Sequence, residues 1–133
     1  MTRAKALTGG VALAAAGASW ALLWSQSSYW NPLLFATLWV GATTLMYLAG
    51  PAGHPGLGVH LRLAVVSVPI WWWFELVNAR VANWQYVGAE RYEQAEYFVL
   101  TSIAFSTVVP ALHSAWRLMG VGEAAPLRRV EPG

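Results

Sequence analysis

The chain has 133 residues, of which 57% are hydrophobic and only 11% are charged. Soluble domains carry a charge on about a quarter of their residues, so eight basic and six acidic side chains are too few to cover a water-facing surface of this size. The composition therefore excludes the soluble globular class and intrinsic disorder. It predicts a protein whose main solvent is lipid.

The cysteine count and the distribution of basic residues narrow the functional classes further. The sequence contains no cysteine, which excludes disulfide frameworks, cysteine-based zinc sites and cysteine-ligated iron–sulfur clusters. The eight basic residues are scattered along the chain without a basic stripe or a recognition motif. We therefore expect no nucleic-acid partner and no metal site.

Four long apolar stretches follow one another along the chain. Each is close to the 17–25 residues that a helix needs to cross about 30 Å of hydrocarbon, and the alternating segments typical of a membrane β-barrel are missing. We predict an all-α integral membrane protein that forms a four-helix transmembrane bundle in a single domain. The predicted spans are residues 6–25, 33–49, 61–81 and 97–116, followed by a short polar tail at 117–133.

The basic residues predict the orientation of these spans. With an even number of spans both termini lie on one side, and six of the eight Lys and Arg residues fall on that side. Only Arg80 and Arg91 fall on the other. By the positive-inside rule both termini are cytoplasmic, as expected of a multi-pass protein of the plasma (inner) membrane of a bacterium. The six residues are Arg3, Lys5, Arg62, Arg117, Arg128 and Arg129.

The first span allows a second interpretation. Arg3 and Lys5, the apolar residues 7–15 and the small residues 16–18 are typical of a signal peptide with its cleavage site. Hydrophobicity continues through residues 20–24, however, which favours an uncleaved span. If cleavage occurred, three spans would remain and the amino terminus would face outward.

Small residues form a stripe on the first predicted span. Gly10, Ala14 and Ala18 recur every four residues, with Ala12 and Ala16 beside them. Because no hydrophobic effect drives apolar surfaces together in lipid, such a stripe lets a neighbouring helix approach closely. We expect it to pack within this chain or against other integral membrane subunits.

Nine tryptophans make the chain tryptophan-rich, and those near the span ends are typical of an aromatic belt. In the third span Trp71, Trp72 and Trp73 precede Phe74. Since consecutive residues point about 100° apart, these rings line three sides of the helix and at least one faces lipid or a partner. The run also offers a stacking surface for a bound lipid, a quinone, a carotenoid or a chlorophyll-type pigment.

A polar seam follows in the third span. At 100° per residue, Glu75, Asn78 and Tyr86 fall within about 80° of one another, with Asn83 flanking them. A charged side chain in the membrane costs a few kcal/mol unless it is paired or protonated, which makes Glu75 the candidate functional residue. We predict a clamp between the third and fourth helices, or else a proton, ion or ligand site. The matching hydroxyls of the fourth span are Ser102 and Ser106.

Two histidines are candidates for a cofactor. His60 opens the third span and His113 lies near the end of the fourth, so both are expected at the cytoplasmic end. Two such imidazoles on neighbouring helices suit a b-type haem, and one alone suits a chlorophyll-type pigment or a quinone oxygen. Interfacial histidines are also common as plain polar contacts.

Two prolines lie inside predicted spans. Pro69 and Pro110 have no backbone N–H and are expected to kink their helices. Pro110 should free the carbonyl group near Ser106 in the fourth span.

Two functional hypotheses fit these observations. The lack of a soluble domain and of a catalytic cluster favours a small noncatalytic accessory subunit of a larger membrane complex, of the respiratory or photosynthetic type. The alternative is a small membrane enzyme or carrier for a lipid or isoprenoid substrate, with Glu75 as acid or base and Asn78, Asn83 and Tyr86 orienting the substrate. In length and number of spans the chain resembles the small heterodimeric carotenoid cyclases, whose paired-acid Pro-Glu-Glu motif it lacks.

Overall fold

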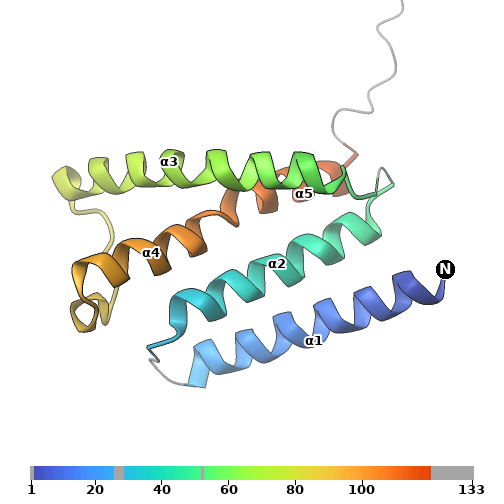
Figure 1. Ribbon diagram of the computed structural model, residues 1–133, viewed down its shortest axis with the longest axis horizontal. Helices are drawn as coiled ribbons and strands as arrows, with labels where there is room; N and C mark the ends of the chain where they lie inside the picture. The colour runs from blue at the N-terminus through green and yellow to red at the C-terminus, as the bar shows by residue number, and fades with distance from the viewer. Residues whose placement is uncertain (1, 26–28, 52, 121–133) are drawn as a thin grey trace, which may run out of the picture.

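The computed structural model describes residues 2–25, 29–51 and 53–120, and within these ranges the chain is helical without strands. Four helical segments are long and apolar enough to cross a membrane, which agrees with the four apolar helices expected from the sequence. The fourth segment consists of two helices in line (Figure 1). The elements are α1 (Arg3–Ser25), α2 (Asn31–Ala49), α3 (Leu57–Val81), the short 3₁₀ helix η1 (Ala89–Arg91), α4 (Gln94–Phe105) and α5 (Val108–Leu118).

The helices begin a few residues before the predicted spans, because the first turn of a helix tolerates polar residues and proline. Helix α2 begins at Asn31, with Pro32 in its first turn, where its missing N–H has no helical partner to lose. Helix α3 begins four residues before the predicted span, at Leu57. The predicted tail at 117–133 overlaps the end of α5, and its residues 121–133 lie outside the described part of the chain.

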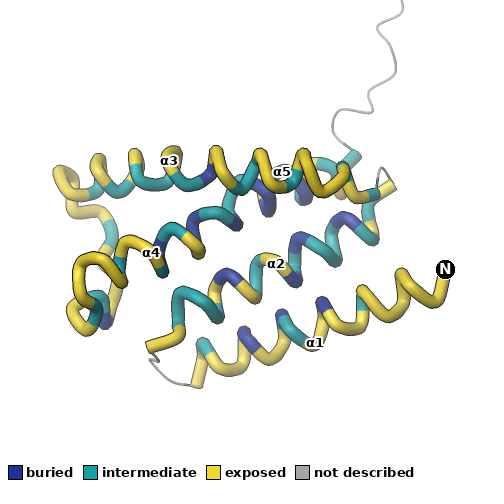
Figure 2. The backbone as a smooth tube through the Cα atoms, in the orientation of Figure 1, coloured by how far each residue is buried: buried dark blue, intermediate teal, exposed yellow. Residues whose placement is uncertain are grey.

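The helices pack as an open row. Helix α2 packs against α1 on one side and against α4 and α5 on the other, and α3 packs against α4 and α5 (Figure 1). Helices α1 and α3 therefore form the two edges, and α3 continues unbroken through Pro69. The predicted bundle is open, and long stretches of both edge helices are exposed (Figure 2).

The row has two different ends. The start of α1, the connection from α2 to α3 and the end of α5 lie together at what we call the terminal end (Figure 1). The connections from α1 to α2 and from α3 to α4 lie at the opposite end, which we call the distal end. Each end contains one cluster of polar and aromatic side chains.

Helices α1 and α2 approach each other closely through small residues. Ala12 and Ala16 are buried, and a Cβ atom at Gly41 would lie 2.7 Å from the carbonyl oxygen of Ala12 and 2.9 Å from the Cβ of Ala16. The expected close approach thus occurs within the chain, but through the opposite side of α1, since Ala12 lies about 200° around the helix from Gly10. The predicted stripe itself is exposed, at Gly10, Ala14 and Ala18.

Residues 106–107 separate α4 from α5, at the place where a proline interruption is expected. Pro110 has no N–H, and its ring excludes a normal helical bond to the carbonyl of residue 106. The wholly buried hydroxyl of Ser67 on α3 donates to the carbonyl of Phe105 at 2.5 Å and accepts the N–H of Val109 at 3.1 Å. One side chain of α3 therefore satisfies backbone groups on both sides of the break.

Candidate functional site

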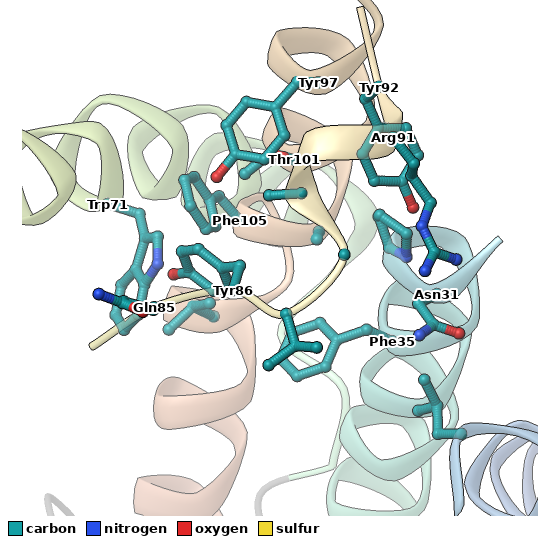
Figure 3. Close-up of a pocket in the computed structure, with 17 residues that line it drawn as sticks. Asn31, Phe35, Trp71, Gln85, Tyr86, Arg91, Tyr92, Tyr97, Thr101 and Phe105 are labelled. Atoms are coloured by element: carbon teal, nitrogen blue, oxygen red, sulfur yellow. The ribbon is translucent and has the colours of Figure 1, made fainter. Parts of the chain in front are cut away.

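A cavity of about 440 Å³ lies at the distal end, where all four spans meet the connection between α3 and α4 (Figure 3). Its volume lies within the range of small-molecule sites, about 300–1,000 Å³. Most of the wall is apolar, and polar groups lie among it. The aromatic residues are Phe35, Trp71, Tyr86, Tyr92, Tyr97 and Phe105, and the polar ones include Asn31, Gln85, Arg91 and Thr101.

The three consecutive tryptophans of α3 lie in three different environments, as the roughly 100° between successive helical residues predicts. Trp71 lines the cavity, and its ring centre lies 5.7 Å from that of the buried Phe105. Trp72 stacks on Phe98 at 5.0 Å and is a packing residue. Trp73 is 63% exposed. Of the three predicted stacking residues, only Trp71 belongs to the cavity.

Glu75 lies beside the cavity and organises its wall. Its Oε1 atom accepts a hydrogen bond from the hydroxyl of Tyr86 at 2.6 Å and another from the indole N–H of Trp84 at 3.2 Å. The Tyr86 side chain lines the cavity, whereas Glu75 is not among the lining residues. We call Glu75, Asn78, Trp84 and Tyr86 the Glu75 network.

Asn78 fixes the reversal of the chain that brings the other members of the network to Glu75. Helix α3 ends at Val81, and Ala82 adopts the left-handed conformation with a φ of 49°. The side-chain oxygen of Asn78 accepts the N–H groups of Asn83 and Trp84, and its amide donates to the carbonyl of Trp84 at 2.9 Å. The side-chain amide of Asn78 thus donates one hydrogen bond and accepts two, and these hold the segment after α3 against the helix end.

In the described part of the chain the two serines predicted to meet the seam, Ser102 and Ser106, form hydrogen bonds with other groups. Ser102 accepts the indole N–H of Trp72 at 3.0 Å, and the hydroxyl of Ser106 donates to the carbonyl of Ile103 at 2.7 Å. The prediction extended the helical projection as far as Tyr86, whereas the chain reverses after Val81. The segment just after α3 therefore supplies the hydrogen-bond partners of Glu75 and Asn78. Asn83 takes part through its backbone N–H, which donates to Asn78.

A second set of hydrogen bonds lies beside the cavity wall at Tyr92, and we call its residues, Tyr29, Tyr92 and Glu96, the rim. The hydroxyl of Tyr29 donates to Oε1 of Glu96 at 2.8 Å, and that of Tyr92 donates to the carbonyl of Tyr29 at 2.6 Å. The other carboxyl oxygen of Glu96 accepts the N–H of Glu93 in a capping box at the start of α4. The hydrogen bond to Glu96 raises the pKa of Tyr29 above its ordinary value of 10.0. The rim thus joins the two connections of the distal end.

Arg91 lies over a turn that requires glycine. Gly88 is buried and has a φ of 85°, a conformation that other residues rarely adopt. A Cβ atom at this position would lie 2.8 Å from a terminal nitrogen of the Arg91 guanidinium. Both residues line the cavity, and Arg91 is the one charged residue among those described as lining it.

The terminal end contains a cluster of histidines around a buried tyrosine. Tyr47 is 2% exposed, and its hydroxyl lies 2.9 Å from Nδ1 of His113. Its ring centre lies 4.9 Å from that of His54 and 6.1 Å from that of His60. The structure thus brings the two predicted histidines to one side chain and adds His54, which sits in an irregular connection that sequence patterns do not place.

Two of these imidazole nitrogens form hydrogen bonds with other groups of the protein. Nδ1 of His54 accepts the N–H of Gly56 at 3.0 Å, and Nδ1 of His113 is bonded to Tyr47. Nδ1 of His60 is buried with no hydrogen-bond partner within the described ranges. Over the same ranges no three His, Asp or Glu side chains are grouped to hold a metal ion. Cofactor ligation by His60 or His113 remains a prediction.

Sequence reasoning missed the cavity, because five helices and a connection contribute to its lining. The one available signal was the recurrence of tyrosine at positions 86, 92 and 97, around the connection before α4.

Comparison of the chain with protein-family models, with curated proteins and with solved structures found no match. The function is therefore inferred from the distal cavity and its surroundings.

Proposed function

We propose that the protein is a small lipid-binding protein of the bacterial inner membrane, which holds the chain of an isoprenoid or acyl lipid in the distal cavity and acts as its carrier. The observation that supports this is the aromatic-walled cavity of about 440 Å³ with polar groups among its lining. Lipids combine an apolar chain with a polar head, so walls and polar groups of this kind match them.

The packing of the helices supports access from the lipid phase. Helices α2 and α3 both pack against α4 and α5, and each contributes an aromatic wall of the cavity, Phe35 from α2 and Trp71 from α3. Phe35 is itself 37% exposed. In a membrane the exposed part of Phe35 meets lipid chains directly, so a ligand that enters beside this side chain does not cross water.

The position of Glu75 favours binding over catalysis by this residue. Glu75 lies behind Tyr86, and its hydrogen bonds hold the chain segment that forms one wall. A general acid or base must come within hydrogen-bond reach of the substrate. We therefore assign Glu75 a positioning role and favour a carrier over an enzyme that uses it as acid or base.

Purification and lipid extraction test this function. The full-length protein, purified in a mild detergent, should retain a chain-bearing lipid that mass spectrometry detects in about equimolar amount. Ala89 lines the cavity, so Ala89→Trp should fill part of it and reduce retention several-fold. Ala95→Trp changes an exposed residue at the same end and should leave retention unchanged. Equal retention by both variants, or no retained lipid in the wild type, rejects the proposal.

A second function, that of a noncatalytic accessory subunit in a respiratory or photosynthetic membrane complex, is supported by the exposed edges of the row. Helix α1 packs mainly against α2, and on α3 Val65 is 72% and Trp73 is 63% exposed. Native electrophoresis from mild detergent, with an absorption spectrum for pigment, tests this. A single 14.5 kDa species without partner or pigment contradicts it.

A further inference from the structure

We propose that the ligand of the distal cavity carries a phosphate group, which Arg91 binds at the rim while the attached chain lies between the aromatic walls. This inference rests on the proposed lipid-binding function and names the class of lipid. Among the described lining residues Arg91 is charged and none is acidic. A cation among lining residues that are otherwise uncharged favours an anionic head group.

The position of Arg91 is built into the fold. The guanidinium lies against the turn at Gly88, in space that a side chain at position 88 would occupy. The turn is itself held by backbone bonds, with the N–H of Arg91 donating to the carbonyl of Gly88 at 3.4 Å. A planar guanidinium presents its N–H donors in a fork that matches the oxygens of a phosphate, which a lysine does not.

The acidic residues of the same connection and of the start of α4 are not among the described residues that line the cavity. Glu96 accepts hydrogen bonds from Tyr29 and from the N–H of Glu93 through its two oxygens, and the Glu93 side chain caps the start of α4. Glu90 is exposed and does not line the cavity. The described lining therefore contains no carboxylate that would repel an anionic head group.

The dimensions of the cavity suit a head group joined to a chain. Arg91 lies in the connection three residues before α4 begins at Gln94, at the distal end of the row. The lining continues to Phe105 and Val108, and from Gln94 to Val108 the span rises about 20 Å at 1.5 Å per residue. A phosphate at Arg91 thus leaves its chain directed along the aromatic wall.

The test compares matched lipids with and without a phosphate. The purified full-length protein is mixed in detergent micelles with equal amounts of a polyprenyl phosphate and its polyprenol, and separately with a phosphatidic acid and its diacylglycerol. Native mass spectrometry measures the bound fractions. We expect at least one phosphate form to bind about tenfold more than its neutral counterpart, the ratio that one charge-assisted interaction supplies. The pair with the larger ratio identifies an isoprenoid or a glycerolipid source.

Two variants assign the preference to Arg91. Arg91→Gln should bring the ratio close to one while chain binding persists. Arg80→Gln removes an exposed arginine at the same end that does not line the cavity, and should keep the tenfold ratio. Equal binding of phosphate and neutral forms by the wild type overturns the phosphate inference and leaves lipid binding intact. Loss of the preference in Arg80→Gln overturns the assignment to Arg91, and absence of binding by all four lipids contradicts the proposed function itself.

Discussion

At the scale of single residues, the surroundings of Tyr86 change the acidity of its hydroxyl. Burial, and then the hydrogen bond to Glu75, raises its pKa from 10.0 to about 12. Between pH 10 and about pH 12 the folded protein keeps a proton that the unfolded chain releases. The contribution of Tyr86 to the free energy of unfolding is therefore fully present below pH 10 and is lost as pH rises through about 12. The side chain is 43% exposed, so solvent screening keeps this contribution small.

This predicts a late titration of Tyr86. The phenolate absorbance of wild type minus that of Tyr86→Phe should rise with a midpoint near pH 12, because the neutral phenol is favoured beside a carboxylate. Glu75→Gln removes the negative charge and should move the midpoint toward 10. A wild-type midpoint already near 10, or one unaffected by Glu75→Gln, contradicts the hydrogen bond.

Individual residues of the network were predictable from the sequence, and their geometry was not. Glu75, Asn78 and Tyr86 stand out because polar side chains at the end of an apolar span need partners. The seam assumed one continuous helix, whereas Ala82 is left-handed although it is not a glycine. No sequence rule places an alanine there. The three hydrogen bonds of Asn78 supply the stabilisation for that conformation.

At the level of secondary structure, one hydroxyl from another helix forms hydrogen bonds with the backbone on both sides of the break between α4 and α5. Ser67→Ala removes the partner of the Phe105 carbonyl and of the Val109 N–H. An unsatisfied buried backbone group costs about 1–3 kcal/mol, toward the lower end in membrane proteins. Thermal unfolding in detergent should therefore show a lower midpoint for Ser67→Ala. Ser106→Ala removes only a bond to Ile103 within the same turn and should have little effect. Equal effects of the two substitutions would contradict the bridge.

The contact between α1 and α2 depends on the absence of a side chain. Gly41→Ala places a Cβ atom 2.7 Å from the carbonyl oxygen of Ala12, and this oxygen cannot move without its helix. Overpacking of this kind costs about 1–3 kcal/mol. Gly17→Ala places its Cβ in open space on α1 and should be neutral or slightly stabilising, since alanine is the better helix former. A Gly41→Ala protein as stable as the Gly17→Ala protein would mean that the two helices are not in close contact.

The elements were predictable because each apolar run is a local signal. The interruption at residues 106–107 was also predictable, since Pro110 acts on the turn before it. The cavity was not, because Phe35, Trp71 and Phe105 come from three helices whose contacts no single segment specifies. The face of α1 that packs was misplaced for a related reason. Ala12 and Gly10 are both small, and only the position of Gly41 on α2 decides between their faces.

At the level of the whole molecule, the two ends differ in chemistry. The distal end contains the cavity, Arg91 and the aromatic rim, and the terminal end contains the histidines around Tyr47. Four of the six described basic residues belong to the terminal end, namely Arg3, Lys5, Arg62 and Arg117. If the positive-inside rule holds, the distal cavity lies toward the outer leaflet and the histidine cluster faces the cytoplasm.

This sidedness is open to a direct test because the chain has no cysteine, so any introduced thiol is the only one. Val87 is 94% exposed in the distal connection, and Thr2 is exposed before α1. On intact bacterial cells a membrane-impermeant maleimide should label Val87→Cys and not Thr2→Cys, which should react only after the membrane is permeabilised. The reverse pattern would place the cavity in the cytoplasmic leaflet and contradict the orientation. Labelling of both variants on intact cells would contradict four spans, and a Thr2→Cys protein that stays unlabelled after permeabilisation, with a smaller intact mass, would show that the first span is cleaved.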